Sequence, residues 1–105
     1  MHPDFHILAE RSGIDPAVLQ EISALADCHG LSRVILFGSR ARGDFCRTSD
    51  IDLAVSGGFI PGFALDVEEE TSTLLKFDVV DLDLSVQQEL LHSIEREGIT
   101  IYEKI

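Results

Sequence analysis

The stretch GSRARGDFCRTSDIDLAV, residues 38–55, decides the fold that we expect for this chain of 105 residues. It follows the apolar run Arg33–Phe37 (RVILF) and ends in the alternating segment Asp50–Val55 (DIDLAV), and both patterns are typical of buried strands. The glycine, arginine and serine residues between them predict a loop that contains one helical turn. The stretch therefore predicts two strands joined by a short polar connection.

The residues before this stretch predict a helical segment over 1–29. Asp15 is a good helix N-cap, Pro16 suits the first helical position, and Gly30 is a typical stop signal. Apolar residues recur at helical spacing between Pro16 and Gly30. Residues 1–13 are weakly patterned and allow a short helical turn before Gly13.

The residues after this stretch predict two more helices and up to two more strands. We expect a helix over 63–75, a strand over Phe77–Leu82, a helix capped by Ser85 and Gln88 and ended by Gly98, and an edge strand over Ile99–Tyr102. This order predicts a small α/β domain with a sheet of three to four strands, and the length suits one domain over 1–105.

Two aspartates open the second expected strand. Residues i and i+2 of a strand face the same way, so Asp50 and Asp52 place two carboxylates on one face, roughly 6.5–7 Å apart. A solvated strand edge would explain one such residue. A pair that directly precedes apolar residues is better explained by a divalent cation that compensates their repulsion.

A third carboxylate, Asp78, comes second in the otherwise apolar run FDVVDL. A helical connection between strands favours a parallel pair, which brings like ends together. We therefore expect Asp78 beside Asp50 and Asp52. Asp81 and Asp83 belong to the opposite face by strand parity, and Asp81 remains the alternative third ligand.

Gly38 and Ser39 directly follow the first expected strand. A strand that ends at glycine and enters a helical turn presents backbone N–H groups and a hydroxyl, which suits a phosphate, although it is also an ordinary turn. Gly38 would permit close approach, Ser39 would donate to a phosphate oxygen, and Arg40 or Arg42 would neutralise charge. If the first two strands are antiparallel, these residues lie at the same end as the carboxylates.

The net charge excludes one class of function and favours another. Eight Lys and Arg residues stand against 19 Asp and Glu residues, which gives a net charge of −11. Such acidity argues against general nucleic-acid binding, and it favours a basic protein partner or divalent cations. We see no signal peptide pattern and no apolar run of membrane-spanning length, so we expect a cytoplasmic protein that is not bound to a membrane.

Carboxylates beside a phosphate-binding turn suit a site with two Mg²⁺ ions for nucleotidyl transfer from a nucleoside triphosphate to a hydroxyl. Gly38-Ser39, ten residues and Asp50-Ile51-Asp52 form a GSx10DxD pattern. With FDVVDL, this pattern resembles the minimal nucleotidyltransferases (MNT) of the DNA polymerase beta-like superfamily over about 30–105.

The resemblance implies the nucleotidyltransferase fold, a mixed sheet flanked by helices. It also implies that Asp50 and Asp52 bind metal, that Asp78 is the third ligand and general base, and that ATP is the nucleotide donor. Many members of this group are antitoxins that transfer AMP to a tyrosine of a helical HEPN toxin. The partner here would be such a toxin, in a homo- or hetero-oligomer that the sequence does not define.

Two alternatives remain open at the level of sequence. The protein could be an antitoxin that neutralises its toxin by binding, without a need for catalysis. It could instead modify a small molecule, as aminoglycoside nucleotidyltransferases do, although those enzymes usually carry an additional substrate-binding domain.

Overall fold

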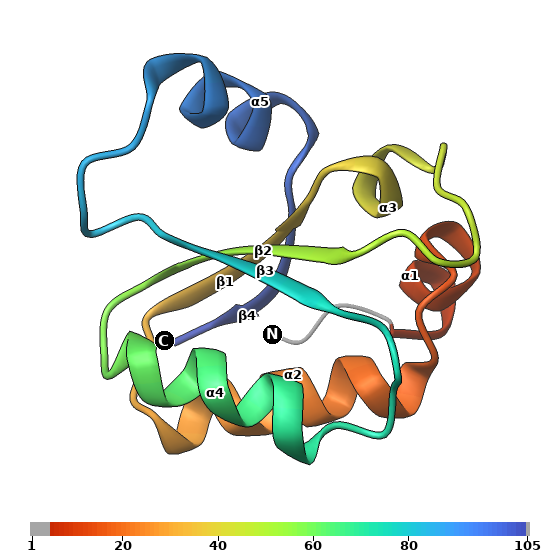
Figure 1. The fold of residues 1–105 in the computed structure, drawn as a ribbon, viewed down its shortest axis with the longest axis horizontal. Helices are drawn as coiled ribbons and strands as arrows, with labels where there is room; N and C mark the ends of the chain where they lie inside the picture. Colours follow the sequence, from red (N-terminus) through yellow and green to blue (C-terminus); the bar gives the residue numbers. More distant parts are fainter. Residues whose placement is uncertain (1–4, 105) are drawn as a thin grey trace.

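The computed structural model describes residues 5–104, which form five helices and four strands around one sheet (Figure 1). The helices are α1 (Phe5–Ser12), α2 (Pro16–Cys28), α3 (Ser39–Arg42), α4 (Ile60–Glu70) and α5 (Gln88–Glu97), and the strands are β1 (Arg33–Phe37), β2 (Ile51–Ser56), β3 (Phe77–Asp81) and β4 (Ile99–Glu103). None of the helices between residues 5 and 104 combines the length and the apolar composition needed to cross a membrane.

The sheet is mixed and has the strand order β3-β2-β1-β4. β1 pairs antiparallel with both β2 and β4, and β2 pairs parallel with β3. The helical connection through α4 permits the parallel pair, because parallel strands need a crossover. The expected mixed sheet of three to four strands flanked by helices is confirmed.

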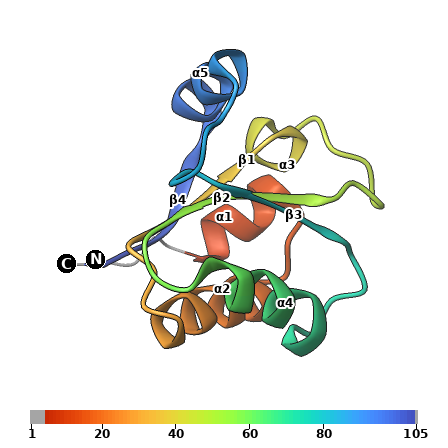
Figure 2. The same ribbon diagram turned by 60° about the vertical axis from the view of Figure 1, so that its left-hand side comes forward.

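Helices lie on both faces of the sheet. α2 and α4 pack side by side on one face, and α5 lies on the other (Figures 1 and 2). The first face forms the larger core, which includes Val34, Leu36 and Leu53, and the second forms a smaller core around Ile35, Phe37 and Ile94. The alternation along β1 follows from the two-residue period of a strand.

The start of α2 is the one that the sequence predicts. The side chain of Asp15 accepts a hydrogen bond from the Ala17 N–H at 2.8 Å, and Pro16 occupies the first turn. Such a cap satisfies a backbone donor that the helix itself leaves unpaired. Gly30 follows the helix with a positive φ of 68°, which glycine adopts without steric cost.

Helix α4 differs from the predicted helix over 63–75. It begins at Ile60, because Pro61 is well tolerated in a first turn, and it ends at Glu70. Beyond that point the Thr71 hydroxyl donates to the Val67 carbonyl, and a hydroxyl that bonds the backbone competes with helix continuation. Leu74, which the predicted helix would include, lies beyond α4 and is fully exposed.

The predicted cap at Ser85 is also wrong. α5 begins at Gln88 after Gln87, whose side chain makes no capping hydrogen bond. The turn after β3 is fixed instead by aspartates, because Asp81 accepts from the Asp83 N–H and Asp83 accepts from the Gly57 N–H. These contacts keep the chain close to β2, and the helix starts later.

Arg40 has a structural role, and of the two arginines predicted to neutralise phosphate charge it is the less accessible. Its side chain is only 1% exposed and lies over the Phe45 ring, 4.9 Å from the centroid. Its guanidinium donates to four backbone carbonyls, those of Ser12, Cys46, Arg47 and Ser49. Arg40 therefore joins the end of α1 to the loop between α3 and β2, and these bonds engage all three guanidinium nitrogens.

Arg40→Ala should lower the free energy of unfolding by about 3 kcal/mol or more, because it leaves several carbonyl groups without their charged donor. Urea unfolding followed by circular dichroism measures this change. Arg96→Ala, which removes an exposed arginine from α5, is the control and should change stability by less than about 0.5 kcal/mol. Similar losses in the two variants would contradict the structural role.

Candidate active site

The centre of the candidate site is a close approach between Gly38 and Asp52. Phe37 and Asp52 are partners in the antiparallel register of β1 and β2, so Gly38 directly follows the strand opposite Asp52. The Asp52 carboxylate lies where a Cβ on residue 38 would be. Gly38 also has a φ of 77°, which L side chains rarely adopt. Only glycine therefore fits this position without displacing the carboxylate.

Asp52 and Asp78 lie opposite each other on neighbouring strands. They are partners in the parallel register of β2 and β3, as the sequence predicts. By strand parity, Asp52 shares its face with Ala54, and Asp78 shares its face with Val80. Ala54 and Val80 belong to the smaller core beneath α5. Asp52 is partly buried whereas Asp78 is exposed, so the pair forms a carboxylate surface that is open at β3.

Asp50 is exposed and lies just before β2, which begins at Ile51. It therefore flanks the pair from the connection between α3 and β2 and does not belong to the strand itself. Its charge still reaches Asp52, because it contributes to the raised pKa of that carboxyl group.

Burial and neighbouring charges raise the pKa of Asp52 to about 6. Desolvation is the largest cause, followed by the charges of Asp78 and Asp50, while Arg42 opposes the shift. A carboxylate that is desolvated among like charges lacks compensation, and a bound cation would supply it. Perturbed carboxyl groups of this kind are typical of functional sites.

Hard oxygen ligands suit Mg²⁺, so the chemistry of Asp50, Asp52 and Asp78 fits the metal that the sequence predicts. Within residues 5–104, however, no three His, Cys, Asp or Glu side chains converge closely enough to hold a metal ion together. The structure thus brings Asp52 and Asp78 side by side, with Asp50 at the edge, and does not show a closed metal site.

The turn after β1 is the predicted single helical turn. α3 follows Gly38, and the Ser39 hydroxyl has no hydrogen-bond partner among residues 5–104. Arg42 lies at the end of α3, with its side chain 46% exposed. Its Nε donates to the Asp44 carboxylate at 3.2 Å. Hydrogen bonds to Asp44 and Glu97 raise the pKa of Arg42 above its ordinary value. Arg42, unlike Arg40, is exposed and lies close enough to Asp52 for its charge to oppose the rise in the pKa of that carboxyl group.

Sequence reasoning missed Glu97, the last residue of α5. Its Oε1 accepts hydrogen bonds from the Gly38 N–H at 3.3 Å and from Arg42 Nη1 at 3.0 Å. The contact spans 59 residues in the chain, so no local pattern indicates it. The only local signal is an acidic residue just before the glycine that ends the helix.

Asp81, the alternative third ligand, lies away from this surface. It pairs with Val55 at the far end of β2, and its carboxylate accepts the Asp83 N–H at 2.9 Å. Its side chain therefore supports the turn after β3. The arrangement favours Asp78 over Asp81 as the carboxylate that accompanies Asp52.

The chain matches a family model over residues 20–105. The model is described as Polymerase beta, Nucleotidyltransferase. A protein of Methanocaldococcus jannaschii that is named a protein adenylyltransferase is 37% identical over 62 residues. That alignment covers 59% of this chain and 60% of the relative, so it spans less than two thirds of the relative's length.

Solved structures share the fold. A crystal structure of a toxin–antitoxin with AMP-PNP contains a chain that is 26% identical, with a TM-score of 0.67, over 82% of this chain and 73% of that one. A complex of a tri-AMPylated Shewanella oneidensis HEPN toxin with an MNT antitoxin matches at 21% identity and a TM-score of 0.61, over 83% and 71% of the chains. The second likeness shows the fold alone.

Asp52→Asn should raise the free energy of unfolding by about 1 kcal/mol at neutral pH, with the gain vanishing as the pH falls toward about 4. In the wild type, the stability linked to Asp52 is fully present below the pKa that its carboxyl group has in the unfolded chain. It is lost as the pH rises through the folded pKa of about 6, because the partly buried carboxyl group must then ionise, whereas asparagine stays neutral. The expected gain is small because the group is only partly buried. Urea unfolding in metal-free buffer across this range measures it, with Glu70→Gln on the exposed end of α4 as control. A gain that is constant with pH would contradict the raised pKa.

Gly38→Ala should cost at least about 1 kcal/mol more stability than Gly30→Ala. Both glycines have a positive φ, of 77° and 68°, so both variants are strained. Only at position 38 would the new Cβ meet the Asp52 carboxylate, because nothing lies within 4 Å of a Cβ at position 30. Urea unfolding of the two variants isolates the contribution of the close approach, and equal losses would contradict it.

Proposed function

The chain belongs to the polymerase beta nucleotidyltransferase family, and on that premise we propose that it transfers AMP from ATP to a hydroxyl group of a partner protein. The observation that carries this proposal is the register of the central strands, which sets Asp52 opposite Asp78 and against Gly38. The name of the Methanocaldococcus jannaschii relative supports AMP as the transferred group and a protein as the acceptor.

Each residue of the site has a role in this proposal. Asp50, Asp52 and Asp78 would hold Mg²⁺, which when bound neutralises charge on the triphosphate. The Gly38 N–H, the Ser39 hydroxyl and Arg42 are the donors that hold and orient the phosphate oxygens. The toxin–antitoxin structure with AMP-PNP, a chemical analogue of ATP, supports the nucleotide.

Asp78 is the general base of the proposed reaction. It is exposed on an edge strand beside Asp52, where an acceptor hydroxyl can reach it. The hydroxyl oxygen attacks the α-phosphorus, its proton passes to the Asp78 carboxylate, and the bond to the β-phosphate breaks to release pyrophosphate. A positioned base contributes about 10²–10⁴-fold to such a rate.

We further propose that the acceptor is a tyrosine of a basic, helical HEPN-type toxin and that this chain is the antitoxin. The toxin–antitoxin neighbour, 26% identical, supports the pairing. The net charge of −11 supports a basic partner, because complementary charge accelerates association.

We also propose that residues 1–105 act as one domain, with the helices before β1 as part of it. α2 packs against α4, β1 and β4, and Arg40 bonds the Ser12 carbonyl at the end of α1 at 2.9 Å. The N-terminal helices thus support the turn that carries Gly38 and Arg42.

Asp78→Asn should stop AMP transfer to the partner toxin while Mg²⁺–ATP binding is largely retained, because the base is lost and Asp50 and Asp52 remain. Mass spectrometry of the toxin after incubation with Mg²⁺ and ATP detects the added AMP, and calorimetry measures binding. Asp81→Asn is the matched control and should be nearly silent, because an asparagine oxygen can still accept the Asp83 N–H.

Asp52→Asn completes the experiment and should abolish Mg²⁺–ATP binding. If the wild type transfers no AMP to the toxin, the proposed activity is wrong. If Asp81→Asn abolishes transfer while Asp78→Asn leaves it intact, Asp81 is the third carboxylate.

A further inference from the structure

The end of α5 holds a carboxylate at the nucleotide side of the site. Glu97 is the last residue of the helix, and its side chain is 17% exposed. Gly98 fixes this end, because its N–H donates to the Ile94 carbonyl at 2.8 Å and a Cβ there would come within 2.6 Å of Ile35 Cγ2. The backbone at Gly98, directly after Glu97, is therefore tightly packed against β1, the strand that leads into Gly38.

The Glu97 carboxylate is bound by the same donors that we assign to the triphosphate. Its Oε1 accepts from the Gly38 N–H at 3.3 Å and from Arg42 Nη1 at 3.0 Å, and its Oε2 accepts from Nη1 at 3.2 Å. A backbone N–H at a strand end and a guanidinium are typical ligands of an anion. The place that would receive a phosphate oxygen already holds an anion of the protein itself.

The contact is suited to exchange. The hydrogen bond from Gly38 lies at the long end of the usual range, whereas a charge-assisted bond to phosphate is typically about 2.7–2.9 Å. Glu97 can leave by rotation of its side-chain torsions, since the helix end need not move. Its charge also lies close enough to act on Asp52, so a triphosphate meets repulsion for as long as Glu97 stays.

We propose that Glu97 competes with the nucleotide triphosphate for the Gly38 N–H and Arg42, and so sets the affinity of the site for nucleotide. This inference rests on the proposed function and adds a residue that lowers the affinity of the site for nucleotide. Binding then requires that a phosphate group displace the Glu97 carboxylate. This requirement lowers the affinity most for ligands that lack a strongly charged anionic group.

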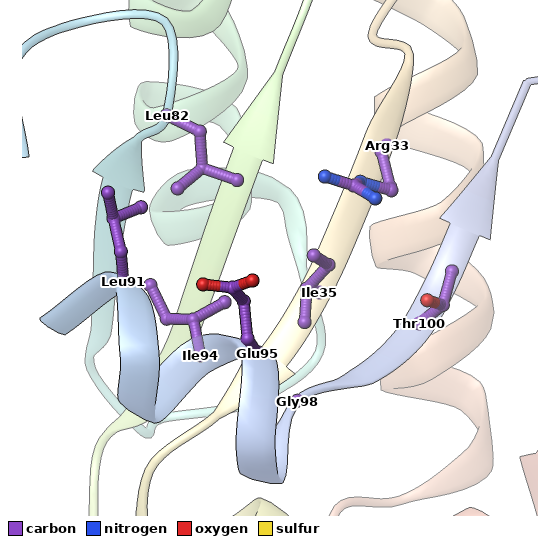
Figure 3. A pocket seen from close by; sticks show the side chains of 8 residues that line it. All are labelled: Arg33, Ile35, Leu82, Leu91, Ile94, Glu95, Gly98 and Thr100. Carbon is purple, nitrogen blue, oxygen red and sulfur yellow. The ribbon is translucent and has the colours of Figure 1, made fainter. Parts of the chain in front are cut away.

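Glu97→Gln should bind Mg²⁺–AMP-PNP about threefold to tenfold more tightly than the wild type, because the competing charge is removed. Glu95→Gln is the matched control. It makes the same change in net charge on the same helix, but Glu95 lines the pocket between α5 and the sheet with Arg33 and Ile35 (Figure 3). Calorimetry should show an unchanged affinity for this control.

A second measurement needs no nucleotide. In the free protein, the amide resonance of Gly38 should move in Glu97→Ala and stay in place in Glu95→Ala, since only Glu97 accepts that N–H. An unmoved Gly38 resonance in Glu97→Ala would overturn the proposal.

The binding outcomes separate this inference from the proposed function. Tighter binding in Glu97→Gln alone supports competition, and it does so even if the wild type binds too weakly to measure. Equal or weaker binding, with a wild type that binds nucleotide, overturns competition and leaves the proposed function intact. Absence of binding in the wild type and both variants overturns both.

Discussion

The approach of the Asp52 carboxylate to Gly38 is the constraint on which the rest of the site depends. It requires a glycine directly after β1 and an antiparallel register that pairs Phe37 with Asp52. The Asp52 carboxyl group held there is partly desolvated, which raises its pKa to about 6. Once Asp52 is fixed, the parallel partner strand places Asp78 beside it. The turn after Gly38 places Arg42 near Asp52. This approach of a side-chain carboxylate to a glycine thus organises the charges of three chain segments.

The two arginines of this turn are divided between structure and site. Arg40 and Arg42 are two residues apart on a single helical turn, so they point in different directions. Arg40 is buried and joins the loop carbonyls, which stabilises the turn from behind. Arg42 is exposed and pairs with carboxylates in front. The rigidity that Arg40 supplies allows a short exposed turn to hold donors in place.

The sequence predicts the parts of this arrangement that depend on strand periodicity. The parallel crossover that places Asp78 beside Asp52 follows from local pattern and handedness. Asp50, expected to open the same strand as Asp52, lies just before β2 and so outside the strand period. The sequence does not predict which arginine is buried, because both lie on the same short turn and no local pattern distinguishes them. That choice depends on the position of Phe45 and of α1, which is set by tertiary packing. The sequence does not predict the contacts of Glu97 either, because its partners Gly38 and Arg42 lie 59 and 55 residues away in the chain.

The strand order also explains how a small sheet can separate the two ends of the proposed transfer reaction. In-line displacement needs the attacking oxygen and the leaving phosphate on opposite sides of the phosphorus. β2 carries Asp52 at the centre, the edge strand β3 carries Asp78 on one side, and the turn after β1 carries Gly38 and Arg42 on the other. An acceptor hydroxyl that reaches Asp78 from the open β3 edge therefore approaches from the side opposite Gly38 and Arg42, the groups proposed to donate hydrogen bonds to the phosphate. β2 pairs parallel with β3 on one side and antiparallel with β1 on the other, so the start of β3 and the end of β1 lie at the same end of the sheet. Asp78 and Gly38 therefore lie at that end but on opposite sides of Asp52.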